Sequence, residues 1–315
     1  MSGLNSRILV LGGNGFIGSH LVEALVAEGW PVRVFSRSKY RPDEAIPGVD
    51  YRYADFADSV SVAEALVDVD VVVHLISTTV PTTANLDPAA DIRGNLISTV
   101  SLLQQMRELG VSRLVYLSSG GTVYGDARTI PIPEEHPRAP LSSYGIVKVA
   151  IENYIAMFSS LYGLQALVLR PSNPYGPRQG HLGVQGVIPT FFQRILSGEE
   201  IRIWGDGSTV RDYLYISDLV DFLVKSIHRR LTGVYNVGYG EGASLREILS
   251  LVEEISGRRA NVRYLPSRGF DVRKVILDIS KARHALDWEP RITLPEGCQR
   301  YWQWARGRTS CLEKQ

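Results

Sequence analysis

Two side chains in the stretch SSYGIVKVAIENY, which begins at Ser142, have the chemistry needed for proton transfer. Tyr144 and Lys148 are four residues apart, and on a helix residues at this spacing lie on the same face. An ammonium beside a phenol favours the phenolate and lowers the tyrosine pKa from its ordinary value of about 10. The pair predicts a proton acceptor, although a surface tyrosine beside a solvated lysine has the same spacing. Other parts of the sequence must therefore decide between the two interpretations.

A glycine-rich stretch near the N-terminus has the chemistry needed to hold a nucleotide. LGGNGFIGSH contains Gly12-x-x-Gly15-x-x-Gly18 between a predicted strand and a predicted helix. Glycines let the backbone turn tightly and approach a pyrophosphate without a Cβ in the way. The helix that follows offers unpaired N–H groups and the positive end of its dipole. The motif predicts a dinucleotide site in the first βα unit.

The ends of the next two predicted strands bear on the choice of dinucleotide. NAD sites usually have Asp or Glu at the end of the second strand, where the carboxylate binds the adenine ribose. Here Ser36 takes that position and Arg37 follows it. An arginine there can pair with a 2′-phosphate and favour NADP, but a surface arginine at a strand end fits equally well. Asp55, after the third strand, is a candidate partner for the adenine amine.

The order of apolar runs predicts the fold that positions these residues. Strands are predicted at 7–13, 31–37, 49–55, 70–77, 113–119 and 166–172, with helices at 16–28, 60–67, 89–109 and 144–161. Continuously apolar strands that alternate with helices indicate an α/β fold with a doubly wound parallel sheet of the Rossmann type.

The second half of the chain is less regular. Helices are predicted near 187–197, 217–229 and 244–256. The Pro- and Gly-bearing stretch 171–186 is the predicted boundary region. It separates a dinucleotide-binding domain at 1–172 from a smaller substrate-binding α/β part at 173–315, packed directly on the first.

The composition excludes several classes of protein. The chain has 315 residues, 44% apolar and 21% charged, with a formal net charge of +1, which gives no basis for nucleic-acid binding. No apolar run is long enough to span a membrane. The two cysteines make no disulfide framework, and no metal-ligand spacing is present. A cytoplasmic location is expected.

With Asn95 and the stretch SSGGTVYG at 118–125 added, these motifs resemble the extended short-chain dehydrogenase/reductases. Within them, the chain is similar to the nucleotide-sugar epimerases that act on UDP-glucose or UDP-N-acetylglucosamine at C4. The resemblance implies that Tyr144 is the acid/base, that Lys148 binds the nicotinamide ribose, and that Ser119, or alternatively Ser118, contacts the reacting oxygen. It also implies NAD as the cofactor, with these binding residues: Gly12, Gly15, Phe16, Ile17, Gly18, Ser36, Arg37, Asp55, Phe56, Asn95 and Lys148.

The resemblance also assigns residues to the UDP-sugar. Asn173 would meet the diphosphate or the sugar, and the backbone at Gly186 and Val187 would flank the uracil. Arg211 and Arg268 would pair with the diphosphate, since each guanidinium can donate two hydrogen bonds. Each arginine could instead be an ordinary solvated surface residue.

Two positions indicate which sugar reacts and how. Some relatives carry a bulky tyrosine where this chain has Val275, and the smaller valine favours UDP-GlcNAc and UDP-GalNAc. UDP-glucose and UDP-galactose remain possible substrates. Dehydratases and decarboxylases of the family place an acid just after the hydroxyl, where this chain has Gly120 and Gly121. The lack of an acid at these positions favours a 4-epimerase that oxidises and re-reduces one carbon.

Two other functions remain open, together with the assembly and the pathway. Arg37 would suit an NADP-dependent reductase or dehydrogenase on the same fold, and a dinucleotide sensor without chemistry would need no Tyr144–Lys148 pair. The resemblance implies a homodimer, formed through the helices at 89–109 and 144–161, and a role in polysaccharide precursor supply.

Overall fold

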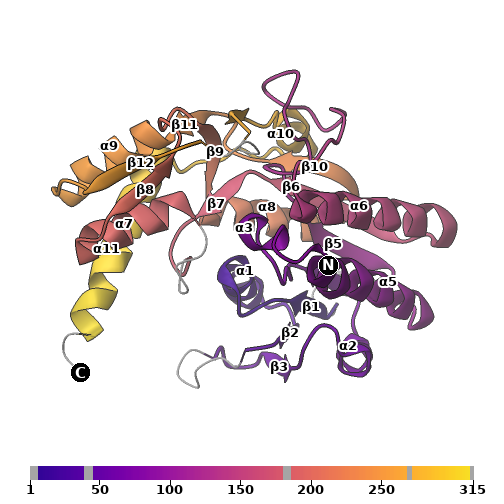
Figure 1. Cartoon of the computed structure of the whole chain (residues 1–315). Helices are drawn as coiled ribbons and strands as arrows, with labels where there is room; N and C mark the ends of the chain where they lie inside the picture. The colour runs from indigo at the N-terminus through magenta and orange to yellow at the C-terminus, as the bar shows by residue number, and fades with distance from the viewer. Residues whose placement is uncertain (1–5, 39–44, 180–185, 268–271, 313–315) are drawn as a thin grey trace. The chain divides into compact units, whose positions relative to one another are not determined.

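The computed structural model describes residues 6–38, 45–179, 186–267 and 272–312 (Figure 1). The chain forms two compact units, and neither is continuous in sequence. The first comprises Met1–Val123, Arg138–Arg170 and Val220–Tyr235, and the second comprises Tyr124–Pro137, Pro171–Leu219 and Asn236–Gln315. The boundary predicted at 172/173 falls beside the one at Arg170/Pro171. Residues 124–137 belong to the second unit and residues 220–235 to the first, which was not predicted. The separate role assigned to each part stays a prediction.

The first unit is built on a seven-stranded sheet in the order β10-β6-β5-β4-β1-β2-β3. Its strands are β1 (Ile8–Leu11), β2 (Val32–Ser36), β3 (Asp50–Tyr53), β4 (Val71–His74), β5 (Arg113–Leu117), β6 (Gln165–Pro171) and β10 (Gly233–Val237). The pairs from β3 through to β6 are all parallel. The six predicted strands and the Rossmann-type fold are confirmed.

Helices cover both faces of this sheet. They are α1 (Phe16–Ala27), α2 (Ser59–Leu66), α3 (Pro81–Ala84), α4 (Pro88–Asp91), the π-helix η1 (Ile92–Ile97), α5 (Ser98–Glu108) and α6 (Ser143–Tyr162). The chain leaves β1 towards β2 but crosses from β4 to β5 in the opposite direction. Right-handed crossovers therefore put α1 on one face and α2, α5 and α6 on the other, as Figure 1 shows. The second group shares one apolar core with β1, β4 and β5.

Helix α6 carries the predicted proton acceptor, and its ends are set by local sequence. The Ser142 hydroxyl accepts the N–H of Gly145, which caps the first turn. The helix ends at Gly163, whose φ of 71° is in the left-handed region that favours glycine. A buried stripe that includes Val147, Ile151 and Ile155 packs on the sheet. The helix is thus held in one rotation about its axis, which fixes where Tyr144 lies.

The second unit is built on shorter strands. Its β-structure consists of β7 (Asn173–Tyr175), β8 (Ile201–Trp204), β9 (Val210–Tyr215), β11 (Gly242–Ser244), β12 (Val262–Leu265) and β13 (Lys274–Val275). Strand β9 pairs with β7, β11 and β13, and β8 pairs with β12. The helices are α7 (Val187–Ser197), α9 (Leu245–Ser256), α10 (Ser280–Leu286) and α11 (Leu294–Leu312), while α8 (Ile216–His228) spans both units. The three helices predicted in this half are confirmed. Across the described ranges, no helix is long and apolar enough to cross a membrane.

Candidate active site

The loop after β1 has the shape that the glycine motif predicts. Gly12 has a φ of 87°, and its carbonyl oxygen accepts the N–H of Gly15. A Cβ at Gly18 would lie 2.2 Å from that same carbonyl oxygen, so the first turn of α1 packs directly against the loop. Phe16 and Ile17 open α1, and Gly15 precedes it without a side-chain cap. The N–H groups of this turn are therefore available to a phosphate, as the dinucleotide prediction requires.

The loop lies where the strand order of the sheet reverses, between β1 and β4. In open parallel sheets, ligands bind at this point beyond the carboxyl ends of the strands. Ser36 ends β2 and is buried, and Arg37 after it is exposed. Asp55 is exposed two residues after β3, and its carboxylate accepts the N–H of Ala57. Phe56 is buried against the ring of His74. The donor set and the glycine cradle fit a dinucleotide.

Asn95 lies in the π-helix η1 and is almost fully engaged with its neighbours. Its side-chain oxygen accepts the N–H of Thr78 at 2.8 Å, and its amide donates to Asp91 at 2.8 Å and to Thr79 at 3.2 Å. Asn95 thus ties the loop after β4 to the helix. A direct contact of Asn95 with the cofactor stays a prediction.

Tyr144 and Lys148 lie on one face of α6, with the lysine Nζ 5.6 Å from the centre of the phenol ring. Lys148 is buried, and its Nζ donates to the carbonyl oxygen of Leu117 at 2.9 Å. Burial lowers the pKa of Lys148 to about 8, while the charges of Glu152 and Asp91 oppose that fall. The Lys148 ammonium can therefore lose its proton at a pH closer to neutrality than an ordinary lysine does.

The pKa of Tyr144 differs from the expectation drawn from the lysine alone. Burial raises the pKa of this half-buried phenol to about 12, a hydrogen bond with Ser77 works in the other direction, and the charge of Asp91 raises the pKa further. Lys148 does not bring the phenol into the working range by itself, because its ammonium is directed at Leu117. A further positive charge near the phenol would be needed to stabilise the phenolate.

The two candidate serines after β5 have different surroundings. Ser118 is buried, and its hydroxyl donates to the Glu152 carboxylate at 2.5 Å. Ser119 is only half-buried, and its hydroxyl forms no hydrogen bond with any other residue that the structure describes. Of the two, Ser119 therefore has the hydroxyl that is available to a ligand.

Sequence reasoning missed Glu152, which lies one turn beyond Lys148 on α6. Its carboxylate is buried and accepts hydrogen bonds from Arg170 at 2.6 and 3.1 Å and from Arg138 at 3.2 Å. The spacing Tyr144, Lys148, Glu152 repeats every four residues, so the helical period that identified the pair also pointed to this carboxylate.

His74 ends β4 beneath this group and is fully buried. The Thr99 hydroxyl donates its one hydrogen to the carbonyl oxygen of Asn95, so it accepts from Nε2 of His74 at 2.9 Å. Nδ1 is then the unprotonated nitrogen, and it has no partner among the described residues. Burial lowers the pKa of His74 to about 3, and the charge of Lys148 adds to this effect. His74 is a neutral residue.

In the second unit, β9 brings three predicted residues to one face of its sheet. Arg211 lies opposite Val275 on β13, and Asn173 on β7 lies opposite Tyr213. Arg211 and Tyr213 are two residues apart on β9, so all four side chains project to the same side. The Asn173 amide donates to the Asp212 carbonyl oxygen at 3.2 Å. Val275 is buried beside the arginine.

Gly186 and Val187 lie at the start of α7. Gly186 has a φ of 93° and precedes the helix without a side-chain cap, and Val187 is its first residue. The first N–H groups of a helix have no partner within it, so this turn suits a polar ligand. Arg268 lies outside the described residues.

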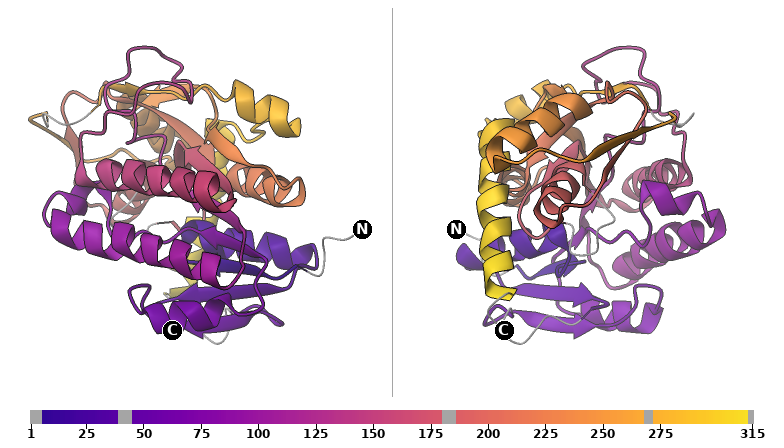
Figure 2. Two further views of the ribbon diagram at one scale, coloured as in Figure 1. Left: turned by 90° about the vertical axis from the view of Figure 1, so that its right-hand side faces the viewer. Right: turned by 60° about the vertical axis from the view of Figure 1, so that its left-hand side comes forward.

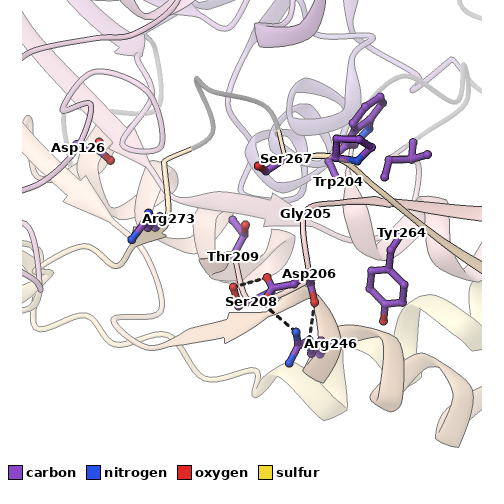
Figure 3. A pocket seen from close by; sticks show the side chains of 12 residues that line it. Asp126, Trp204, Gly205, Asp206, Ser208, Thr209, Arg246, Tyr264, Ser267 and Arg273 are labelled. Atoms are coloured by element: carbon purple, nitrogen blue, oxygen red, sulfur yellow. Dashed lines mark hydrogen bonds and ion pairs between the residues drawn. The ribbon is translucent and has the colours of Figure 1, made fainter.

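A cavity of about 1090 Å³ lies in the second unit beside the segment Gly205–Ser208 (Figure 3). The segment is held in place by Arg246, whose guanidinium contacts the carboxylate of Asp206 at 3.0 Å. Half of the Tyr264 side chain and much of Trp204 are exposed. The lining of the cavity includes two aromatic rings, two guanidinium groups and two hydroxyl groups. These belong to Trp204, Tyr264, Arg246, Arg273, Ser208 and Thr209. The lining residues that come from α9 and β12, such as Arg246 and Tyr264, were not predicted from the sequence.

A family model described as the NAD dependent epimerase/dehydratase family matches residues 8–238. The prediction of NAD agrees with this description and is confirmed, and the reading of Arg37 as an NADP signal is not favoured. The match also confirms the resemblance inferred from the motifs.

Solved structures of other proteins match over nearly the whole chain. A UDP-glucose 4-epimerase of Thermotoga maritima, crystallised with UDP-glucose, is 35% identical and has a TM-score of 0.91; 96% of this chain and 99% of that one are covered. A UDP-glucose 4-epimerase of Thermus thermophilus in complex with NAD is 34% identical, with a TM-score of 0.90 and the same coverage. A UDP-N-acetylglucosamine 4-epimerase of Methanobrevibacter ruminantium is 26% identical, with a TM-score of 0.89 over 96% and 99% of the two chains.

Proposed function

Because the chain belongs to the NAD dependent epimerase/dehydratase family, we propose that it is a UDP-sugar 4-epimerase with NAD as its resident cofactor. The observation that carries this proposal is the group formed by Tyr144, Lys148 and Ser119 at the carboxyl ends of β4 and β5. The group holds a phenol, an ammonium and an available hydroxyl within one unit. These are the side chains that a reversible oxidation of an alcohol requires.

The residues of the group have different roles in the proposed reaction. When bound, the nicotinamide supplies the acceptor and donor of a hydride at C4 of the sugar. Tyr144 takes the proton of the 4-hydroxyl in the first half-reaction and returns it in the second. Ser119 donates a hydrogen bond to the same oxygen. Lys148 holds the cofactor ribose and, by its charge, supports the phenolate.

The second unit supplies residues for the UDP end of the substrate. Arg211 and Arg268 are proposed to pair with the diphosphate, Asn173 to bind beside it, and the backbone of Gly186 and Val187 to flank the uracil. We assign the uracil end to the cavity beside Trp204, where a ring and several polar groups face the open space. Tight contacts at UDP and weak ones at the sugar leave the 4-keto sugar free to turn over between the half-reactions.

We propose UDP-GlcNAc and UDP-GalNAc as the preferred pair, with UDP-glucose and UDP-galactose as the alternative. The support is the small side chain of Val275, which leaves room for a 2-acetamido group. Val275 on β13 pairs with Arg211 on β9. The solved relatives named above act on sugars of both kinds. The cytoplasm and polysaccharide precursor supply are retained as the proposed setting.

A homodimer is proposed from the surface of α5 and α6, which lie side by side in the left view of Figure 2. Tyr154, Met157 and Leu161 form an exposed apolar stripe on α6, and Leu161 is 62% exposed. Leu161→Glu should yield a monomer by light scattering, while Val60→Glu, at an exposed valine of α2, should leave the mass unchanged. Equal masses for both variants would exclude this face.

The test of the function uses the purified protein with each UDP-sugar and no added cofactor. Proton NMR should show UDP-GlcNAc converting to a mixture with UDP-GalNAc. Tyr144→Phe should abolish the conversion, and Tyr154→Phe, at an exposed tyrosine of the same helix, should retain it. If conversion occurs only while added NADPH is consumed, the chain is a reductase and the proposal fails.

A further inference from the structure

Asp91 is a fully buried carboxylate to which the proposed reaction assigns no part. It ends α4, and its side chain accepts three hydrogen bonds from three different segments. One oxygen accepts the Thr79 hydroxyl at 2.7 Å and the Asn95 amide at 2.8 Å. The other accepts the Ser143 hydroxyl at 2.7 Å. All three donors are neutral, and no lysine or arginine among the described residues forms an ion pair with Asp91.

The third hydrogen bond connects Asp91 to the proposed acid/base. Ser143 is the first residue of α6 and directly precedes Tyr144. Its N–H also donates to the side chain of Asn85 at 2.8 Å, so both hydrogen-bond donors of Ser143 are held. The other two hydrogen bonds hold the loop after β4 and the helix that carries Asn95. One carboxylate thus joins the start of α6 to both segments.

We infer that Asp91 is a positioning residue for the acid/base tyrosine, whose place it fixes through Ser143 and whose neutral phenol it favours by its charge. The inference rests on the proposed function. An epimerase must return the proton that it removes, and a fixed anion near the phenol favours the protonated form. The phenolate then depends on a cationic partner, which the oxidised nicotinamide supplies and the reduced one does not.

The other groups around Tyr144 must be counted in any pH dependence. From α6, Lys148 faces the phenol and Glu152 faces Lys148. From β5, the buried hydroxyl of Tyr116 lies close enough for its pKa to be raised, mainly by burial and next by Tyr144. Ser77 hydrogen-bonds the phenol, and neutral His74 lies by Lys148. Asp91 is the anion among these that acts directly on Tyr144.

Asp91→Asn separates the charge from the hydrogen bonds. The amide oxygen can still accept from Thr79 and Asn95, and the Ser143 hydroxyl can reverse and accept from the new NH₂ group. In protein purified with its cofactor and labelled with ¹³C at tyrosine Cζ, the resonance of Tyr144 is identified by its loss in Tyr144→Phe. Its titration midpoint should move to lower pH in Asp91→Asn. Glu108→Gln, at an exposed carboxylate that ends α5, is the control for net charge and should leave the midpoint unchanged.

The positioning role is tested by Ser143→Ala, which keeps the charge and removes the connection. Its kcat should fall about tenfold or more with a nearly unchanged KM, since the phenol is misplaced and UDP binding is not. An unchanged midpoint in Asp91→Asn, or an unchanged kcat in Ser143→Ala, overturns the inference. The NMR titration needs no turnover, so failure of the epimerase proposal would be seen separately, as a wild-type protein that converts no UDP-sugar.

Discussion

The Ser118 hydroxyl donates a 2.5 Å hydrogen bond to the buried carboxylate of Glu152. This contact joins the end of β5 to the face of α6 that carries Lys148. Because its only hydrogen is used, Ser118 has none left to donate to a substrate, which favours Ser119 for the proposed role. Two adjacent serines with the same side chain therefore have separate expected roles, one structural and one at the proposed substrate.

The two serines should respond differently to substitution. Ser119→Ala should lower kcat about 100-fold, as expected for loss of a hydrogen-bond donor to a reacting oxygen, without changing the melting temperature. Ser118→Ala should change kcat little and lower the free energy of unfolding by about 2 kcal/mol, since a charged acceptor loses a donor. Steady-state kinetics and urea unfolding measure both. The reverse pattern would assign the reaction to Ser118.

Gly18→Ala should prevent retention of the cofactor. A methyl group 2.2 Å from the Gly12 carbonyl oxygen forces the loop and the first turn of α1 apart. We expect protein purified from this variant to release far less NAD on acid treatment than the wild type. Gly307→Ala is the matched control, because a Cβ there meets nothing within 4 Å. Full NAD content in Gly18→Ala would contradict the proposed phosphate site.

The low pKa of the buried His74 side chain predicts that the protein loses stability in mild acid. The pKa of His74 is about 3 in the folded protein against 6.5 as the ordinary value, so the unfolded chain binds more protons below pH 6.5. The contribution is fully present above pH 6.5 and is lost as the pH falls towards 3. At pH 5 the loss is about 2 kcal/mol, a figure that depends almost entirely on the unfolded value.

His74→Gln should remove this dependence, since the glutamine amide can replace Nε2–H as the donor to Thr99. Urea unfolding at pH 7 and pH 5 measures the difference for each protein. The decrease between the two pH values should be smaller in the variant by about 2 kcal/mol. Equal decreases would mean that His74 does not titrate in this range in either state.

Val275→Tyr should separate the two sugar pairs. The ring would extend from β13 on the side of Arg211 and take up space beside the proposed substrate. We expect kcat/KM for UDP-GlcNAc to fall at least about tenfold while that for UDP-glucose is kept. Val275→Ile controls for a small increase in volume at a buried position. An equal loss on both substrates would remove Val275 from the account of specificity.

The first half of the fold could be predicted because its strands are continuous apolar runs separated by helices. Strands such as β11, with the sequence Gly-Ala-Ser, have no such signal. They exist because β9 pairs with partners that are distant in the chain, which no local pattern encodes. Residues 220–235 belong to the first unit for the same reason: β10 pairs with β6, which is distant in the chain.

The sequence named the residues proposed to react, but it missed the buried carboxylates that lie near them. Glu152 and Asp91 each lie four residues from a predicted residue, Lys148 and Asn95, so the helical period pointed to both. The raised pKa of Tyr144 could not be predicted, because a spacing of four gives a shared face but not the depth at which that face is buried.

The π-helix η1 contains in effect one surplus residue in a path that an α-helix would otherwise follow. If the same residues formed regular α-helical turns instead, everything beyond Ile92–Ile97 would be rotated by about 100° relative to Asp91. Asp91 and Asn95 on one side, and Leu102, Leu103 and Met106 of the core on the other, could then no longer both face inwards. The wide turn of this segment therefore sets the angle between the face that carries the site and the face that joins the core.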